Sequence, residues 1–219
     1  MGYRLAADLS YCVLNGDPYF LDIRRDRYFR LHGALKSAFL ALSPDARIAE
    51  DAAEPLLRQG VVEWTNAAGL PAPAAIDTPM HSLAEQDCGR VRGAARCVSE
   101  IAWTLLRARH ERRTTPLSEI IDRRRREIAP LKNERFDTEG ARMASTFNQI
   151  RRVIPGAGVC LPDSIALLDF LARRGQPARI VIGIKGDPFA AHCWVQSDTL
   201  LLNETADVAA GFAPIGVFP

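Results

Sequence analysis

The chain has 219 residues, of which 47% are hydrophobic and 25% are charged, values typical of a folded globular protein and not of disordered, collagen-like or coiled-coil chains. Its formal net charge of +2 is too small to create a strong overall field, so no nucleic-acid partner is expected. No two of the five cysteines are separated by two residues, so neither a disulfide framework nor a metal site is predicted.

The amino-terminal segment gives no sign of export. Asp8 follows Met1 too closely to leave room for an apolar stretch of signal-peptide length. Apolar runs further along, such as residues 180–184, are far too short to span a bilayer. We therefore expect a cytoplasmic protein with no membrane partner, whose cysteines are either buried apolar residues or a single nucleophile.

Residues 1–65 predict a small α+β unit. Residues 18–22 and 27–31 are rich in β-prone side chains and are joined by a short polar connection, which is typical of a hairpin. After this hairpin the apolar residues recur at helical spacing. A second helix is expected to end at Gly60, before a short strand at 61–64.

Residues 66–130 predict a connector followed by a basic helical segment. Residues 65–79 are rich in Ala and Pro, a composition that favours an extended, semi-rigid linker. The segment after the linker has apolar residues at amphipathic helical spacing from Val91 to Leu106. The arginine run at 123–126 is typical of a solvated helix face, although such a run can also attract an acidic peptide or a phosphate group, including ATP.

Residues 131–219 predict a helix followed by an antiparallel meander. The helix is expected to start near Pro162 and to end before Gly175, because proline favours the first turn of a helix and glycine its end. Turn residues divide the remainder into three predicted strands, at 179–183, around 192–196 and at 200–203.

Cys160 lies at the start of this helix, where the helix dipole and the free N–H groups of the first turn favour a thiolate. A thiolate becomes an acyl-transfer nucleophile when an imidazole lies within hydrogen-bond reach and a third group orients that imidazole. His192 is the only histidine in the last third of the chain. Glu204 and Asn203 are both candidates for the third group, but adjacent strand residues face opposite ways, so only one can serve. We favour Glu204.

The residues around these candidates resemble one family closely. Residues 160–167, CLPDSIAL, and residues 188–195, PFAAHCWV, resemble the CLxxSxAL helix start and the PFxAHxWV strand of the lasso-peptide biosynthesis B proteins. These are transglutaminase-like cysteine proteases that remove the leader from a lasso precursor peptide. The resemblance covers about residues 155–206 and is specific there.

This resemblance implies roles for the three candidate residues and a partner. Cys160 takes the position of the nucleophile and His192 that of the base, and the third member, usually Asp in the family, falls on Glu204. The freed core peptide would pass to a separate asparagine-synthetase-like lasso cyclase. ATP is implied by the family alone, because the chain has no glycine-rich phosphate loop.

Residues 1–65 are similar, more weakly, to the RiPP recognition element, a PqqD-like winged helix-turn-helix module. The similarity is carried by residues 19–22 and 27–31. In that family the leader peptide adds as an extra strand beside the third strand and lies against the third helix, a form of β-augmentation. The groove is expected to be lined by Tyr28, Phe29, Leu31 and Leu56.

The predicted fold class is therefore α+β: a PqqD-like winged helix-turn-helix module, a helical linker, and a transglutaminase-like or papain-like cysteine protease domain. The predicted function is a cysteine endopeptidase that binds the leader of a lasso precursor and cleaves it from the core peptide. Transglutaminase-like amide transfer and a non-catalytic peptide-binding module are the alternatives. The other cysteines are expected to fill the core, Cys193 facing away from the site, and Trp194 either walls the cleft or packs in the core.

Overall fold

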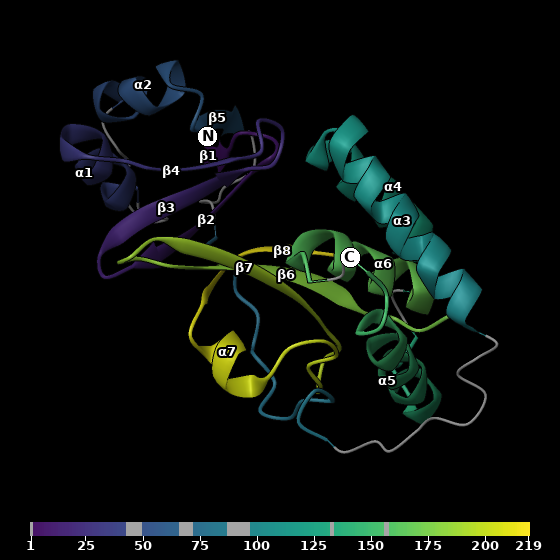
Figure 1. The fold of residues 1–219 in the computed structure, drawn as a ribbon. Helices are drawn as coiled ribbons and strands as arrows, with labels where there is room; N and C mark the ends of the chain where they lie inside the picture. The colour runs from purple at the N-terminus through teal and green to yellow at the C-terminus, as the bar shows by residue number, and fades with distance from the viewer. Residues whose placement is uncertain (1, 43–49, 66–71, 87–96, 132–133, 156–157) are drawn as a thin grey trace. The chain divides into compact units, whose positions relative to one another are not determined.

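A computed structural model describes the chain except for residue 1 and residues 43–49, 66–71, 87–96, 132–133 and 156–157 (Figure 1). The chain divides into two compact units, Met1–Ala75 and Ile76–Pro219. The division differs from the boundaries expected at residues 65 and 130, because the basic helical segment belongs to the second unit.

The first unit is a small β-rich fold with helices. Its two-stranded sheet pairs β1 with β5, and its three-stranded antiparallel sheet has the order β2-β3-β4. The elements are β1 (Gly2–Leu5), β2 (Leu9–Leu14), β3 (Asp17–Asp22), β4 (Arg27–Arg30), α1 (Gly33–Ala41), α2 (Glu50–Arg58) and β5 (Val62–Thr65). The expected hairpin, first helix, helix end near Gly60 and final short strand are therefore all present.

Two strands of this unit were not expected, β1 and β2. The β2–β3 connection is the dipeptide Asn15-Gly16, in which both residues have positive φ angles, 52° and 78°. A two-residue turn of this kind requires positive φ at both positions, and Asn-Gly supplies it at the lowest steric cost. The sequence signal for the β2–β3 hairpin was therefore available.

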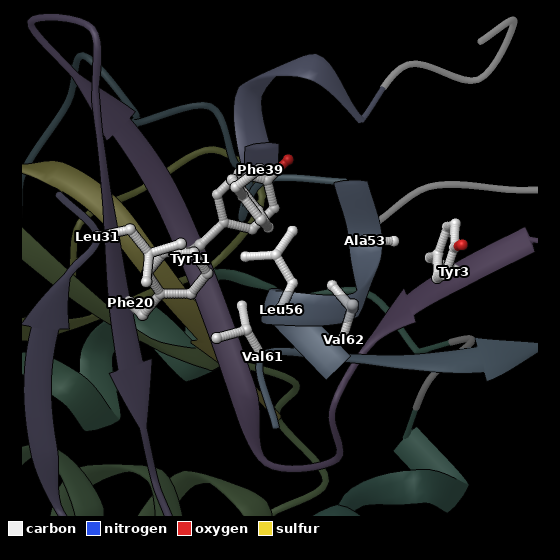
Figure 2. Packing of buried hydrophobic residues seen from close by; sticks show 9 residues of the cluster. All are labelled: Tyr3, Tyr11, Phe20, Leu31, Phe39, Ala53, Leu56, Val61 and Val62. Carbon is white, nitrogen blue, oxygen red and sulfur yellow. The ribbon is translucent and has the colours of Figure 1, made fainter. Parts of the chain in front are cut away.

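Aromatic packing forms the core of the first unit (Figure 2). Phe20 is fully buried, with its ring stacked 5.0 Å from that of Phe29 and meeting Phe39 edge-on at 4.9 Å. Leu56 is also fully buried, on the inner side of α2. The two helices therefore cover one face of the β2-β3-β4 sheet with apolar side chains, which stabilises the unit by burial.

The second unit combines helices with a three-stranded antiparallel sheet of order β7-β6-β8. Figure 1 shows β6 and β7 as a long hairpin. The elements are α3 (Val98–Thr114), α4 (Leu117–Ile128), η2 (Ala129–Leu131), α5 (Thr138–Arg151), α6 (Cys160–Ala172), β6 (Arg179–Lys185), β7 (Ala190–Gln196), α7 (Ala206–Ala210) and β8 (Ala213–Phe218).

The predicted strand at 200–203 is wrong. Only Leu201 forms isolated bridges there, to Gln196 and Ser82, and the third strand of the sheet is β8, which pairs with β6. The chain leaves the ladder after Leu202 because the Asn203 side chain, in place of a further strand residue, accepts the backbone N–H of Val195 at 2.7 Å.

The central helix α6 is bounded as the sequence predicts. It begins at Cys160, with Pro162 in its first turn, and is followed by Gly175 at φ +70°. The N–H groups of Gly175 and Gln176 turn back to the carbonyls of Ala172 and Leu171, which closes the helix end. Residues 162–171 are all buried, so α6 is the core helix of this unit.

The arginine run at 123–126 is not a solvated face throughout, which corrects that prediction. Arg124 is 2% exposed and donates to Asp169 at 2.8 Å and 3.0 Å and to Glu111 at 2.5 Å, so it joins α3, α4 and α6. Arg123 and Arg125 are also paired with carboxylates. Three of the four guanidinium groups are thus paired with carboxylates, and the fourth, that of Arg126, donates to the backbone carbonyl of Asp122 at 3.2 Å.

The apolar stripe that helix α3 buries agrees only in part with the predicted one. Leu105 is buried as predicted, together with Ile101 and Ala108, whereas Leu106 is 61% exposed. The prediction at Val91 lies outside the described residues. Within the ranges that the structure describes, no helix is both long and apolar enough to cross a membrane.

Candidate active site

Cys160 is held at the first turn of α6 by an anchored loop. Asp163, in the same turn and fully buried, accepts the backbone N–H of Gly158 at 2.7 Å and the Nε–H of Arg151 at 2.6 Å. The first bond ties the segment that leads into the helix to the helix itself. The position of the Cys160 thiol, between these two points, is therefore fixed by the chain on both sides.

His192 lies in β7 and is oriented by Glu204. Its Nε2 donates to Glu204 Oε2 at 2.6 Å, and the other carboxylate oxygen of Glu204 accepts the backbone N–H of Thr205 at 2.9 Å. The ring packs against Phe212, with ring centroids 5.4 Å apart. Because Nε2 is used by the carboxylate, Nδ1 is the nitrogen left for the sulfur of Cys160.

The cross-strand neighbour of His192 is Gly183, and only glycine fits there. A Cβ at this position would lie 2.8 Å from the Cβ of Phe212 and 3.0 Å from the indole ring of Trp194. Both rings pack beside the imidazole. Trp194 is fully buried, so of its two expected roles the structure places it in the core, beneath the histidine.

Hydrogen bonds make Cys160 acidic and His192 basic. The pKa of Cys160 is lowered from 9.0 to about 4, first by a hydrogen bond with the Cys193 side chain and then by the one with His192, against the opposing effect of burial. The pKa of His192 is raised from 6.5 to about 9 by its hydrogen bonds to Cys160 and then Glu204. The hydrogen bond to His192 also lowers the pKa of Glu204. At pH values between about 4 and about 9 the site therefore holds a thiolate on Cys160, an imidazolium on His192 and a carboxylate on Glu204.

The Asn203 side chain does not hydrogen-bond His192, as it would have to do if it were the group that orients the imidazole. Its Oδ1 accepts the N–H of Val195 and its Nδ2 donates to Ser164 Oγ at 3.2 Å, so it joins β7 to α6. The structure thus brings together Cys160, His192 and Glu204, whereas Asn203 supports the backbone beside them.

Cys193 was expected to be a core residue that points to the other face of β7 from His192, and it is a core residue that also acts on Cys160. It is 4% exposed, as a core residue should be, but its side chain hydrogen-bonds Cys160 and its Sγ lies 3.8 Å from Ser164 Oγ. Helix α6 packs against β7, and Ser164, one turn after Cys160, contacts Cys193 and Asn203 there. Cys160 therefore contacts His192 and Cys193, although successive strand residues point to opposite faces.

Sequence reasoning missed three supporting residues as well as Cys193: Asp163, Ser164 and Arg151. Asp163 and Ser164 lie three and four residues after Cys160, within the first turns of the helix, where side chains stack above one another. A polar pair at those positions in an otherwise apolar helix was the available signal.

A second feature lies in the first unit, beside edge strand β4. A groove of about 350 Å³ runs between β4 and the end of α2, and Phe29 and Leu31 line it. Tyr28 does not line the groove, and Leu56 is fully buried in the core. Of the four expected groove residues, the structure brings two to this surface. The lining also includes Arg25, Arg27, Arg30 and His32.

Other candidate sites are fewer. A cavity of about 390 Å³ lies at the opposite end of β6 from His192, lined among others by Arg179, Gln196 and Phe218, and it contains none of the three clustered residues. Among the described residues, no group of three or more His, Cys, Asp or Glu side chains is arranged to hold a metal ion.

Comparison with known proteins gives one match. The family model of the transglutaminase-like superfamily matches residues 102–217, just over half of the chain and most of the second unit. Cys160, His192 and Glu204 all lie inside the matched range. A search of curated proteins and a search of solved structures found no match to the chain.

Proposed function

The chain belongs to the transglutaminase-like superfamily, and on that premise we propose that it is a cysteine endopeptidase that binds the leader of a ribosomal lasso peptide precursor and cleaves it from the core peptide. One observation carries the catalytic part of this proposal. It is the hydrogen-bonded series Cys160–His192–Glu204, in which the Glu204 carboxylate lies 2.6 Å from the imidazole. Such a series is the arrangement that activates a thiol for acyl transfer.

In the first half-reaction the Cys160 thiolate attacks the scissile carbonyl carbon. The sulfur needs no general base at that moment, because its pKa of about 4 keeps it ionised at neutral pH. The N–H of Cys160 has no acceptor within the helix, since it belongs to the first turn, and can donate to the oxyanion. Collapse of the tetrahedral intermediate expels the leaving amine, which takes its proton from the His192 imidazolium.

In the second half-reaction His192, now neutral, accepts a proton from water as the water attacks the thioester. This step releases the leader with a free carboxylate and restores the ion pair. Glu204 acts throughout by holding the ring through Nε2 and stabilising its charged form. No metal takes part in this scheme.

Leader binding belongs to the first unit in this proposal, which treats that unit as a PqqD-like recognition module. In the described part of the chain, strand β4 lies at the edge of its sheet, the position at which an extended peptide can add as a further strand. The groove lined by Phe29 and Leu31 lies along the same edge and can take a side chain of that strand. These two residues, rather than Leu56, are the proposed contacts.

The proposal implies a place in a sequence of two reactions. Cleavage frees the amino group of the core peptide, and a separate asparagine-synthetase-like cyclase would then join that amine to a side-chain carboxylate. ATP stays a prediction that the family resemblance alone implies, and no step of the proposed mechanism uses it.

The test uses a candidate precursor encoded beside this gene. Cys160→Ala is expected to abolish release of the leader while the affinity for the isolated leader, measured by fluorescence anisotropy, is unchanged. Phe29→Lys is expected to do the reverse, weakening leader affinity while Cys160 still reacts with iodoacetamide. If Cys160→Ala still cleaved the leader, the assignment of Cys160 as the nucleophile would be refuted.

Amide transfer is the second candidate, because members of a transglutaminase-like superfamily can pass the same thioester to an amine instead of water. Mass spectrometry of the leader separates the two outcomes: hydrolysis leaves a carboxylate, and transfer leaves an amide. A protein that bound the leader but left it uncut under all conditions would be the third candidate, a peptide-binding module alone.

A further inference from the structure

Two sulfur atoms meet at the candidate active site, and the proposed peptidase reaction uses only one of them. Cys160 and Ser164 are four residues apart and lie on one face of α6. Cys193 packs against this face from β7, with its Sγ 3.8 Å from Ser164 Oγ and its side chain hydrogen-bonded to Cys160. Cys160 is half-buried, whereas Cys193 is 4% exposed.

We propose that Cys160 and Cys193 form a reversible redox pair, in which a hydroperoxide oxidises Cys160 and Cys193 then closes a disulfide that removes the nucleophile. The effect on leader cleavage rests on the proposed function. The disulfide itself does not, because it needs only the two sulfur atoms and an oxidant.

The chemistry takes two balanced steps. The Cys160 thiolate attacks one oxygen of the hydroperoxide, the O–O bond breaks, and the departing alkoxide or hydroxide takes a proton from His192, which leaves sulfenic acid on Cys160. The sulfur of Cys193 then attacks the sulfur of that sulfenic acid. The S–S bond forms as the S–O bond breaks, and the thiol proton leaves with the hydroxyl as water.

The burial of the two residues sets the order of these steps. Oxidation follows thiolate character and exposure, so the half-buried thiolate of Cys160 meets the oxidant first. Cys193 is shielded and neutral, because the hydrogen bond to the Cys160 anion and burial both raise its pKa well above the ordinary value. Cys193 therefore remains an unreacted thiol until Cys160 has been oxidised.

Oxidation of Cys160 then activates Cys193. The largest influence that raises the pKa of Cys193 is the negative sulfur beside it, and sulfenic acid formation replaces this anion with a neutral group. The ionisable groups that act on the Cys160 sulfur are His192 and Cys193. The Asp163 carboxylate, which accepts from Arg151, also raises the pKa of Cys193 through its charge. Cys193 lies beside the Cys160 sulfur, because each cysteine perturbs the pKa of the other and Cys193 contacts Ser164, one helical turn after Cys160, at 3.8 Å. A disulfide then requires the two sulfurs to approach to the bond length of about 2 Å.

The experiment exposes the full chain to a small excess of hydrogen peroxide, blocks free thiols with iodoacetamide and digests the product with trypsin without reduction. Cleavage after Arg152, Arg173 and Lys185 places the two cysteines in different peptides, 153–173 and 186–219, with one cysteine in each. We expect these peptides to be joined, with the loss of two hydrogen atoms, and to separate on reduction with dithiothreitol.

Two variants make this result decisive. Cys193→Ser is expected to give no joined peptide and to carry sulfinic and sulfonic acid on Cys160, since no thiol is present to intercept the sulfenic acid. Cys97→Ser, which removes another incompletely buried cysteine of the same unit, should keep the joined pair. Circular dichroism establishes that each variant is folded.

The proposal is overturned if wild-type Cys160 reaches sulfinic acid as fast as it does in Cys193→Ser, or if Cys160 joins a different cysteine. If the two peptides are joined but the protein cleaves no leader, the redox pair is supported and the proposed peptidase function is refuted. If the protein cleaves the leader but the two peptides are not joined, the peptidase function is supported and the redox pair is refuted.

Discussion

Replacing Glu204 with glutamine removes the charge that supports the imidazolium and keeps the size of the side chain. The pKa of His192 is about 9 against an ordinary 6.5, a net stabilisation of its charged form of about 3 kcal/mol, first by Cys160 and then by Glu204. A hydrogen bond to a charged group contributes about 1.5–3 kcal/mol. Losing the Glu204 carboxylate should therefore lower the pKa of His192 by about one to two, to about 7–8.

The assay follows the ring protons of the histidines by NMR as pH is raised. The chain has four histidines, so the spectrum is simple, and the His192 signal is the one missing from His192→Asn. The wild-type ring keeps its positive charge until the pH rises through about 9. The Glu204→Gln ring should lose its charge at lower pH, and the imidazolium would then no longer be available as the acid at mildly alkaline pH.

Glu127→Gln is the matched control, because Glu127 is an exposed carboxylate on α4. It should leave the His192 titration unchanged. If the midpoint of His192 stayed at the wild-type value in Glu204→Gln, the carboxylate would not be stabilising the ring, and the role given to Glu204 would be refuted. A midpoint near 6.5 in the wild type would contradict the ion pair itself.

Three further predictions concern the packing around the site and are tested by urea unfolding. Arg124→Ala leaves the buried Asp169 without its paired cation and leaves Glu111 with Arg123 alone, and it should cost about 3–5 kcal/mol. The exposed Arg126→Ala should cost less than about 0.5 kcal/mol, and equal losses would mean that the buried pairs contribute nothing. Gly183→Ala should cost about 1–3 kcal/mol, because its Cβ would meet the Trp194 ring at 3.0 Å, and an unchanged unfolding midpoint would contradict this packing. Asp163→Ala should lower the free energy of unfolding by about 3 kcal/mol and slow the alkylation of Cys160. Alkylation of Cys160 at the wild-type rate in folded protein would show that the Asp163 hydrogen bonds do not position its thiol.

Local patterns predicted the elements whose residues are close together in sequence. The hairpin of β3 and β4 and the helix α6 carry their own turn, cap and spacing signals, and each is present where expected. Strand β8 carries a weaker signal, because Pro214 and Gly216 lower its β propensity, and its partner β6 is far away in the chain. The prediction of a strand at 200–203 was wrong for the same reason, because an apolar run does not indicate which strand it pairs with or whether it pairs at all.

Part of the candidate site could also be predicted from local sequence. Cys160 and His192 could be chosen from their position at a helix start and from their order in the chain, since both features can be read without knowledge of tertiary packing. The period-two rule places Cys193 on the face opposite His192, which is true of the strand. The rule cannot show that the first turns of α6 pack against β7, so that both His192 and Cys193 act on the Cys160 sulfur. That meeting depends on tertiary packing between helix and sheet.

The thiolate of Cys160 can be observed directly. The ultraviolet absorbance of the wild type minus that of Cys160→Ser, followed as pH is raised from acid, reports ionisation of this one sulfur. We expect the thiolate to appear with a midpoint at about 4, so that it is fully formed at neutral pH. A midpoint close to the ordinary value of 9.0 would show that His192 and Cys193 do not stabilise the anion, and it would contradict the activated nucleophile on which the proposed function depends.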